Sequence, residues 1–190
     1  MKKDLTAAQG EILLELARNT LEKRFDQAKH VADPVSDPQL LAWGAVFVTL
    51  KKCGKLRGCV GTLQPVSSIW DGVRDNTISA AFHDARFSPL TEAELADITL
   101  SISVLSEPRP LEYDNPEDLP RLLKAGVDGV ILRAEGRSAT FLPQVWEQLP
   151  RPELFLDHLC LKAGLPQDLW RRRVVKIDTY RVQSFQEKKQ

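Results

Sequence analysis

The segment Leu56–Gly61, which reads LRGCVG, constrains this chain more than any other. It follows a run rich in β-branched and aromatic residues (45–50) and a turn that contains Gly54, an arrangement typical of an antiparallel hairpin. Glycine weakens a strand because it adds unfolded-state entropy and has no side chain to pack. Gly58 and Gly61 therefore indicate that some other group approaches the backbone of this strand closely.

Cys59, between the two glycines, is a candidate nucleophile. Arg57 lies two positions upstream, so both side chains share one face of a regular strand. A neighbouring positive charge favours the thiolate form of a cysteine over the thiol. The alternative is that Cys59 is a small buried residue of a tightly packed sheet, as free cysteines often are.

Size and charge exclude some classes of protein. The 190 residues are 43% hydrophobic and 27% charged, which suffices for one substantial domain, or for one core with a smaller lobe. The 26 basic and 26 acidic residues balance to a net charge of zero. This balance argues against a nucleic-acid binder that works through bulk electrostatics. A local basic run remains at Arg171–Arg173, for which a solvated entry to a strand is the favoured interpretation.

The cysteines and the N-terminus predict a reduced, cytoplasmic protein. Cys53, Cys59 and Cys160 have neither the pairing of a disulfide framework nor the spacing of a zinc site, so we expect no bound metal. The N-terminus has the amphipathic pattern of a helix, which is unlike a signal peptide or a membrane span.

The hydrophobic pattern predicts helices and strands in mixed order. We expect helices over 6–29, 67–82, 145–148 and 153–163, a short one from Thr91, and strands over 45–50, 56–61, 98–104, 127–133, 138–142 and 174–185. Because hairpins join most of the strands, the order favours an α+β fold, with an antiparallel sheet and packed helices, over a doubly wound parallel fold. No glycine-rich phosphate loop is present, so no cofactor is expected.

Several motifs resemble those of the AMMECR-one-like domain family. GAVFVTL (44–50), LRGCVG (56–61), FHDARFSP (82–89) and FLPQV (141–145) occur in the family's order, and LCLKAGL (159–165) resembles a later segment. The resemblance covers roughly residues 6–185. It implies one α+β domain over 1–190, with a larger lobe from the N- and C-terminal parts and a smaller lobe from a middle segment. It also implies an association with a radical-SAM enzyme and a Memo-type protein in the AmmeMemoRadiSam system, but no defined activity.

The family signature selects candidate site residues around Cys59. At the matching positions these are Arg57, Gly58, Gly61, Asp84, Arg86, Phe87, Phe141 and Gln144. Asp84 and Arg86 follow the helix that comes after the cysteine strand, so strand, helix and loop can bring them round one cleft with Cys59. Alternatively, they form an ion pair that fixes the loop before Pro89. His83 could form a dyad with Cys59, although a histidine at a helix end is more often packed or capping.

Three functions stay open at this point. The favoured one is a binding component whose cleft holds a small anionic ligand or a partner peptide, with Arg57 and Arg86 as charge-assisted donors. The second is an enzyme in which Cys59 is the nucleophile or covalent carrier, activated by Arg57, with room for substrate beside the glycines. The third is RNA binding through Arg171–Arg173 and Arg181, which zero net charge and the lack of a stacking motif disfavour.

Overall fold

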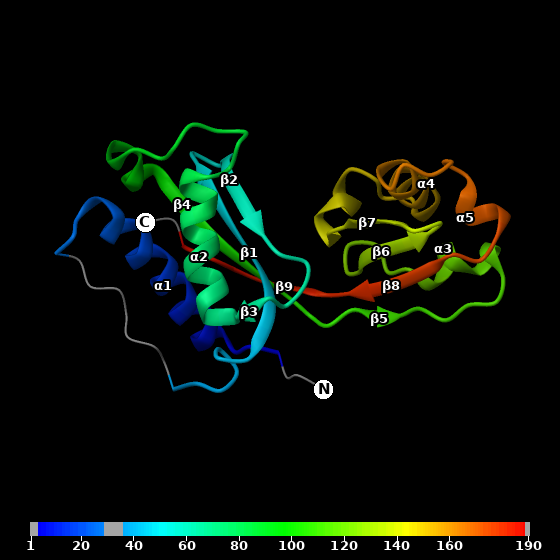
Figure 1. Ribbon diagram of the computed structural model, residues 1–190, viewed down its shortest axis with the longest axis horizontal. Helices are drawn as coiled ribbons and strands as arrows, with labels where there is room; N and C mark the ends of the chain where they lie inside the picture. The colour runs from blue at the N-terminus through cyan, green and yellow to red at the C-terminus, as the bar shows by residue number, and fades with distance from the viewer. Residues whose placement is uncertain (1–3, 29–35, 189–190) are drawn as a thin grey trace. The chain divides into compact units, whose positions relative to one another are not determined.

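The chain folds into two compact units, each with its own sheet (Figure 1). Each unit also has its own hydrophobic core. A computed structural model describes residues 4–28 and 36–188. The first unit comprises Met1–Leu105 and Gln183–Gln190, and the second comprises Ser106–Val182. The α+β class predicted from the sequence is confirmed, since both sheets are antiparallel and both are packed with helices.

The sheet of the first unit contains the predicted hairpin. Its described strands are β1 (Trp43–Lys52), β2 (Lys55–Gly61), β3 (Ser67–Ser68), β4 (Ile98–Leu105) and β9 (Val182–Gln186). Their order is β2-β1-β4-β9, with β3 beside the start of β1. Cys53 and Gly54 have positive φ angles of 48° and 80° at the hairpin turn, the conformation that a tight two-residue turn requires.

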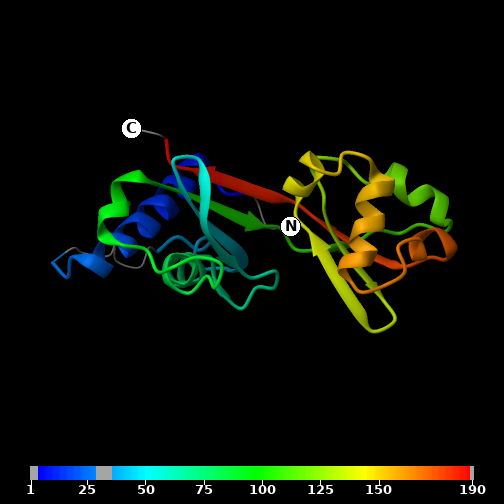
Figure 2. The ribbon, with the colours of Figure 1, turned by 90° about the horizontal axis from the view of Figure 1, so that it is seen from above.

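Two helices pack against this sheet (Figures 1 and 2). Helix α1 (Ala7–Phe25) begins at a capping box of Thr6 and Gln9, and α2 (Ile69–Phe82) is capped by the Ser68 side chain. Both predicted starts are confirmed, but α1 ends at Phe25, before the predicted end at residue 29, which lies outside the described residues. Thr91 opens a 3-10 helix, η1 (Glu92–Asp97).

The second unit is a sheet covered by short helices. Its described strands are β5 (Arg109–Pro110), β6 (Gly129–Ala134), β7 (Arg137–Phe141) and β8 (Lys176–Tyr180), in the order β5-β8-β6-β7. Its helices are η2 (Pro116–Asp118), α3 (Leu119–Leu122), η3 (Pro143–Glu147), α4 (Pro152–Lys162) and α5 (Leu169–Arg172). Phe155 is fully buried and stacks on Trp146 with ring centroids 3.7 Å apart. Both rings belong to the hydrophobic core of this unit.

The strand predicted over 174–185 is wrong as a single element. It consists of β8 and β9, which belong to different sheets and are separated at Arg181. Arg181 pairs with Ser106, at the other end of the second unit: the Ser106 N–H donates to the Arg181 carbonyl at 2.9 Å, and the Arg181 N–H donates to Ser106 Oγ at 3.0 Å. The two ends of the second unit are therefore held together.

Candidate functional site

Cys59 lies on β2, the edge strand of the first sheet, with its side chain on the face away from α2. Gly58 faces α2, and neighbouring residues of a strand point to opposite faces. Cys59 is part-exposed and lies opposite Thr49 of β1, whose Oγ1 donates a hydrogen bond to Sγ over 3.2 Å. The thiol therefore has a neutral hydroxyl as its partner.

A side-chain ion pair clamps the backbone of Cys59. Asp84 Oδ2 accepts the Cys59 N–H at 2.9 Å, and Arg86 Nη2 donates to the Cys59 carbonyl at 3.2 Å. Arg86 also binds Asp84 through Nε (2.9 Å) and Nη2 (2.7 Å). Within the described residues, the outer edge of β2 has no neighbouring strand to bind its main-chain N–H and carbonyl groups. At Cys59 the side chains of Asp84 and Arg86 bind both of these groups instead.

The same contacts determine the charge state of Asp84. Hydrogen bonds from the Arg86 side chain, followed by the Cys59 N–H, outweigh the effect of burial and hold the pKa of this carboxyl well below its usual range. Asp84 is therefore ionised at neutral pH. Phe87 supports the arrangement, because the Arg86 guanidinium lies 5.5 Å from the centre of its ring. The structure thus brings Cys59, Asp84, Arg86 and Phe87 together.

Arg57 is bound to a different part of the first unit. Its Nε and Nη2 donate to the two carboxylate oxygens of Glu94 at 3.0 and 3.1 Å, and Nη1 donates to the Ser88 carbonyl at 2.9 Å. The Arg57 hydrogen bond, followed by that of the Thr91 N–H, holds the pKa of Glu94 well below its usual range. Only 12% of the Arg57 side chain is exposed. Arg57 therefore anchors the 88–94 loop to β2.

Three groups of the protein itself approach the glycines of β2. A Cβ atom on Gly58 would lie 2.0 Å from the Ala80 carbonyl oxygen of α2, and one on Gly61 would lie 2.3 Å from Cγ of Phe47 and 2.4 Å from the Val46 carbonyl oxygen. Close approach to both glycines is therefore real, and the approaching groups are helix backbone, strand backbone and an aromatic ring. The protein's own atoms thus occupy the space beside these glycines that a side chain would fill.

His83 occupies the C-terminal cap of α2. Its backbone N–H donates to the Ser79 carbonyl, and its side chain is exposed. Among the residues described, no hydrogen bond joins the imidazole to Cys59. The capping interpretation is the one that these contacts support.

The remaining candidates belong to the second unit. Phe141 packs edge-on against Phe155 at 5.2 Å, and the Lys162 ammonium lies 5.0 Å from the centre of its ring. Gln144 is exposed on η3. Phe141 is therefore part of the packing of this unit, and Gln144 presents its amide to solvent.

Comparison with known proteins identifies the family of this fold. The AMMECR1 family profile matches residues 14–185. The chain belongs to the AMMECR1 family. A relative from Methanothermobacter thermautotrophicus is 37% identical over 189 residues, and the match covers 96% of each chain. A relative from Thermofilum pendens is 36% identical over 200 residues, and that match covers 96% of this chain and 92% of the relative. The crystal structure of an uncharacterized protein from Pyrococcus horikoshii superposes with a TM-score of 0.83 at 32% identity, covering 97% of this chain and 94% of that one.

The basic run of this AMMECR1 protein is paired with carboxylates. Arg171 binds Asp157, Arg172 binds Asp168 with Nη2 and Oδ2 2.6 Å apart, and Arg173 binds Glu135. Part of the run forms the end of α5, which the sequence did not predict. Such pairing reduces the charge available to a nucleic-acid backbone.

Two further findings concern metals and membranes. Within residues 4–28 and 36–188, histidine, cysteine and acidic side chains do not gather in groups of three that could hold a metal ion. In the same part of the AMMECR1 chain, none of the helices has the length and apolarity needed to cross a bilayer.

Sequence reasoning missed three residues of this AMMECR1 site. Thr49 binds the thiol, Phe47 covers Gly61, and Glu94 binds Arg57. The alternation along β1 could have pointed to Phe47 and Thr49, since both share the face opposite the buried positions of that strand. For Glu94, the sequence indicates only a capping box with Thr91 and gives no sign of its contact with Arg57.

Proposed function

We propose that this AMMECR1 protein is a binding component rather than an independent enzyme, and that it acts with a radical-SAM enzyme and a Memo-type protein in a modification system. The surface that binds is formed by Cys59, Thr49 and Arg86, which we call the Cys59 surface. Its ligand is an anionic group, either on a small molecule or on a peptide of a partner.

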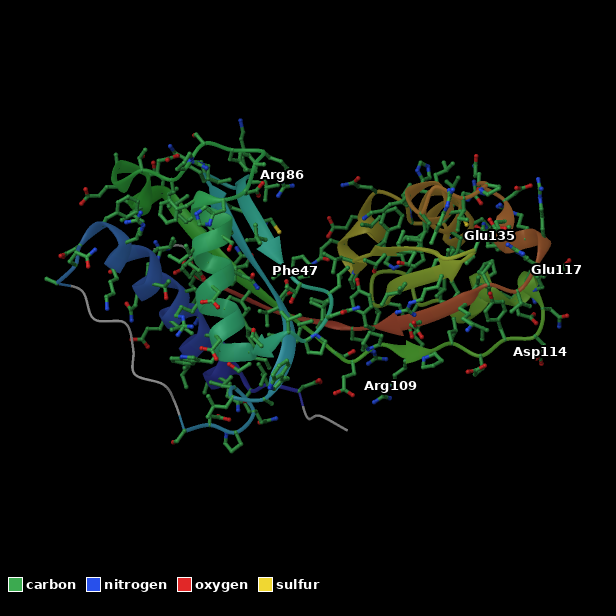
Figure 3. All side chains as sticks on the ribbon, viewed as in Figure 1. Phe47, Arg86, Arg109, Asp114, Glu117 and Glu135 are labelled. Atoms are coloured by element: carbon green, nitrogen blue, oxygen red, sulfur yellow. The ribbon has the colours of Figure 1, made fainter. Side chains whose placement is uncertain are left out.

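The proposal rests on how the charged side chains around Cys59 are used. Arg57 is occupied by Glu94 and by loop carbonyls. Arg86 is 57% exposed, and the described residues provide no hydrogen-bond partner for its Nη1. Arg86 is therefore free to donate to a carboxylate or phosphate here, while its contacts with Asp84 and Cys59 hold it in position. Figure 3 labels Arg86 and Phe47 on the same side of the first unit.

The neighbouring strands add neutral polar groups to this surface. Thr49 lies opposite Cys59 on β2 and opposite Ser101 on β4. Hydroxyl groups such as these can donate or accept hydrogen bonds. The Arg86 guanidinium beside the hydroxyl groups of Thr49 and Ser101 suits recognition of an anionic group.

A nucleophilic role for Cys59 has less support. A catalytic thiol needs a base or a cation close enough to stabilise its thiolate. Among the described residues, the thiol's hydrogen bond is to Thr49, while Asp84 and Arg86 bind the main chain of Cys59. These contacts provide the thiol with no base, and they hold the Arg86 guanidinium on Asp84 and on the Cys59 carbonyl instead of on the thiol.

The test is binding to the purified radical-SAM and Memo-type proteins of the same organism, measured by isothermal titration calorimetry. We expect Arg86→Gln to weaken binding about tenfold, as loss of one hydrogen bond to a charged group implies, and Cys59→Ser to leave it unchanged. Arg74→Gln, which alters an exposed arginine of α2, is the matched control, and circular dichroism checks that each variant is folded. Equal losses for Arg86→Gln and Cys59→Ser would favour a covalent role. Absence of binding by the wild type to both proteins would refute the assignment of partners.

A further inference from the structure

An aromatic ring lies beside the Cys59 surface and is partly open to solvent. Phe47 of β1 is the direct cross-strand partner of Gly61 on β2, and it lies two residues before Thr49. A Cβ atom on Gly61 would lie 2.3 Å from Cγ of Phe47 and 2.5 Å from its Cδ1, so the ring lies against the Gly61 backbone. Phe47 is part-exposed, and a side chain at position 61 would push its ring off the sheet.

The packing of Phe47 is unlike that of the other phenylalanines. Each of the other six has an aromatic or cationic partner or packs against a hydrophobic core. Among the described residues, Phe47 has neither kind of partner and lies outside the core of the first unit. Val46 and Val48 belong to that core, so Phe47 faces the other side of the sheet, away from α1 and α2. The exposed part of its ring can therefore stack on a planar group of a ligand.

The strand residues next to Phe47 on this face are uncharged and hydroxyl-rich. Ser103 of β4 is the cross-strand partner of Phe47, and Ser101 is that of Thr49. Ser184 of β9 lies on the same face, with its Oγ 3.3 Å from that of Ser103. Hydroxyl groups both donate and accept hydrogen bonds. The ring therefore borders a neutral surface that can bind the polar groups of a ligand.

The Arg86 guanidinium lies within the length of one small molecule from this ring. Phe47 and Cys59 are diagonal neighbours across the β1–β2 pair, and such residues have Cα atoms about 7–8 Å apart. Arg86 Nη2 donates to the Cys59 carbonyl at 3.2 Å, so the guanidinium lies at the edge of β2 beside Cys59 (Figure 3). A ligand that contacts both groups needs a spacer of several bonds between its planar ring and its acid group.

We propose that the Cys59 surface, extended by Phe47, binds a nucleoside monophosphate. The base stacks on Phe47, the phosphate accepts hydrogen bonds from Arg86, and the sugar supplies the spacer and hydroxyl groups. Arg86 has the same role here as in the proposed function, on which this inference rests. One ring beside one guanidinium matches a single nucleotide, whereas proteins that bind single-stranded nucleic acids present several aromatic side chains along a basic groove.

Isothermal titration calorimetry at low ionic strength, with adenosine 5′-monophosphate (AMP) added to the full-length protein, tests this assignment. We expect saturable binding to one site that weakens with added salt. Adenosine lacks the phosphate and should bind about tenfold more weakly than AMP. Ribose 5-phosphate lacks the ring and should also bind about tenfold more weakly. Benzoate has a ring and an acid group without a spacer, so it should not displace AMP.

Two substitutions separate the contacts of the ring and of the phosphate. Phe47→Leu should weaken AMP binding about tenfold, since a stacking contact is lost, and should leave ribose 5-phosphate binding unchanged. Arg86→Gln should weaken the binding of both. Phe25→Leu, the same replacement at the end of α1 on the helix-covered side, and Arg74→Gln are the matched controls. Circular dichroism checks that each variant is folded.

Four results would overturn the nucleotide assignment. They are absence of AMP binding by the wild type, equal affinities for AMP and ribose 5-phosphate, equal effects of Phe47→Leu and Phe25→Leu, and an RNA oligonucleotide that binds through Phe47 and that AMP fails to displace. Binding of the partner proteins that depends on Arg86, with no binding of AMP, would overturn this assignment and keep the proposed function. Binding of AMP without binding of either partner protein would do the reverse.

Discussion

Replacing Asp84 with asparagine removes the central charge of the clamp on β2. The carboxylate accepts four hydrogen bonds: from the Cys59 N–H (2.9 Å), the Arg86 N–H (3.2 Å), Arg86 Nε (2.9 Å) and Arg86 Nη2 (2.7 Å). Asparagine has the same shape, but it carries no charge, and one of its two terminal atoms donates instead of accepting. Asp84→Asn therefore weakens the Arg86 contacts and turns one of them into a clash between donors.

The loss of stability expected for Asp84→Asn depends on how deeply Asp84 and Arg86 are buried. Asp84 is buried, whereas more than half of the Arg86 side chain is exposed, so water replaces part of what the guanidinium loses. A hydrogen bond to a charged group contributes about 1.5–3 kcal/mol. We therefore expect Asp84→Asn to lower the free energy of unfolding of the first unit by about 2 kcal/mol at pH 7. Asp75→Asn, which breaks an exposed ion pair with Arg74, should cost at most about 0.5 kcal/mol.

The same substitution has a predictable dependence on pH. The folded protein lowers the pKa of Asp84, so the folded state binds this proton less readily than the unfolded chain. The stabilisation is complete above the ordinary carboxyl pKa of about 4 and is lost as the pH falls from there towards the folded value. The difference between wild type and Asp84→Asn should therefore be largest near neutral pH and shrink below about pH 4.

Hydrogen–deuterium exchange in increasing urea, read by mass spectrometry, measures this effect separately in each unit. Peptides from β1 and β2 report on the first unit, and peptides from β6 and β7 provide an internal reference. The reasoning about the clamp is refuted if Asp84→Asn costs no more than Asp75→Asn at pH 7. A difference between wild type and Asp84→Asn that does not change with pH would refute the assignment of the lowered pKa.

Two further predictions concern β2 and the cysteines. Gly58→Ala places a methyl group against the Ala80 carbonyl of α2. Since helix backbone cannot move aside easily, we expect the free energy of unfolding, measured in urea, to fall by about 3 kcal/mol. A fall below about 1 kcal/mol would contradict the close approach. Iodoacetamide should modify the exposed Cys53 first, the part-exposed Cys59 next and the buried Cys160 last, because burial raises the pKa of that thiol. Mass spectrometry gives the order, and modification of Cys59 before Cys53 would indicate an activated thiol.

Much of the local structure could be predicted because its signals lie within a few residues. The starts of the helices predicted over 6–29 and 67–82 and the turn at Gly54 depend on short stretches, and the structure confirms them, with caps at Thr6 and Ser68. The end of α1 was less predictable, since neither glycine nor proline follows Phe25 until Pro34.

The partners of the site residues could not be read from local patterns. The alternation of the strand relates Arg57 to Cys59, yet Arg57 binds Glu94, 37 positions along the chain. Likewise, the assignment of β8 and β9 to different sheets depends on pairing with distant strands, while the residues around Arg181 look like one continuous strand. Contacts between residues far apart in the chain therefore explain why the last strand was predicted as one element. They also explain why the partner of Arg57 could not be predicted.

The paired ends of the second unit have a consequence for how the chain folds. Strand β9 joins its sheet only after residues 106–182 have been synthesised. If that stretch were a flexible loop of roughly 80 residues, closing it would cost about 4 kcal/mol of chain entropy. Once the second unit has folded, the Ser106–Arg181 hydrogen bonds hold its ends together, so β9 returns to β4 across what is effectively a short connection. If the second unit folds first, it therefore removes most of the entropic cost of bringing β9 to β4. Until β9 arrives, the edge of β4 that β9 covers is unpaired.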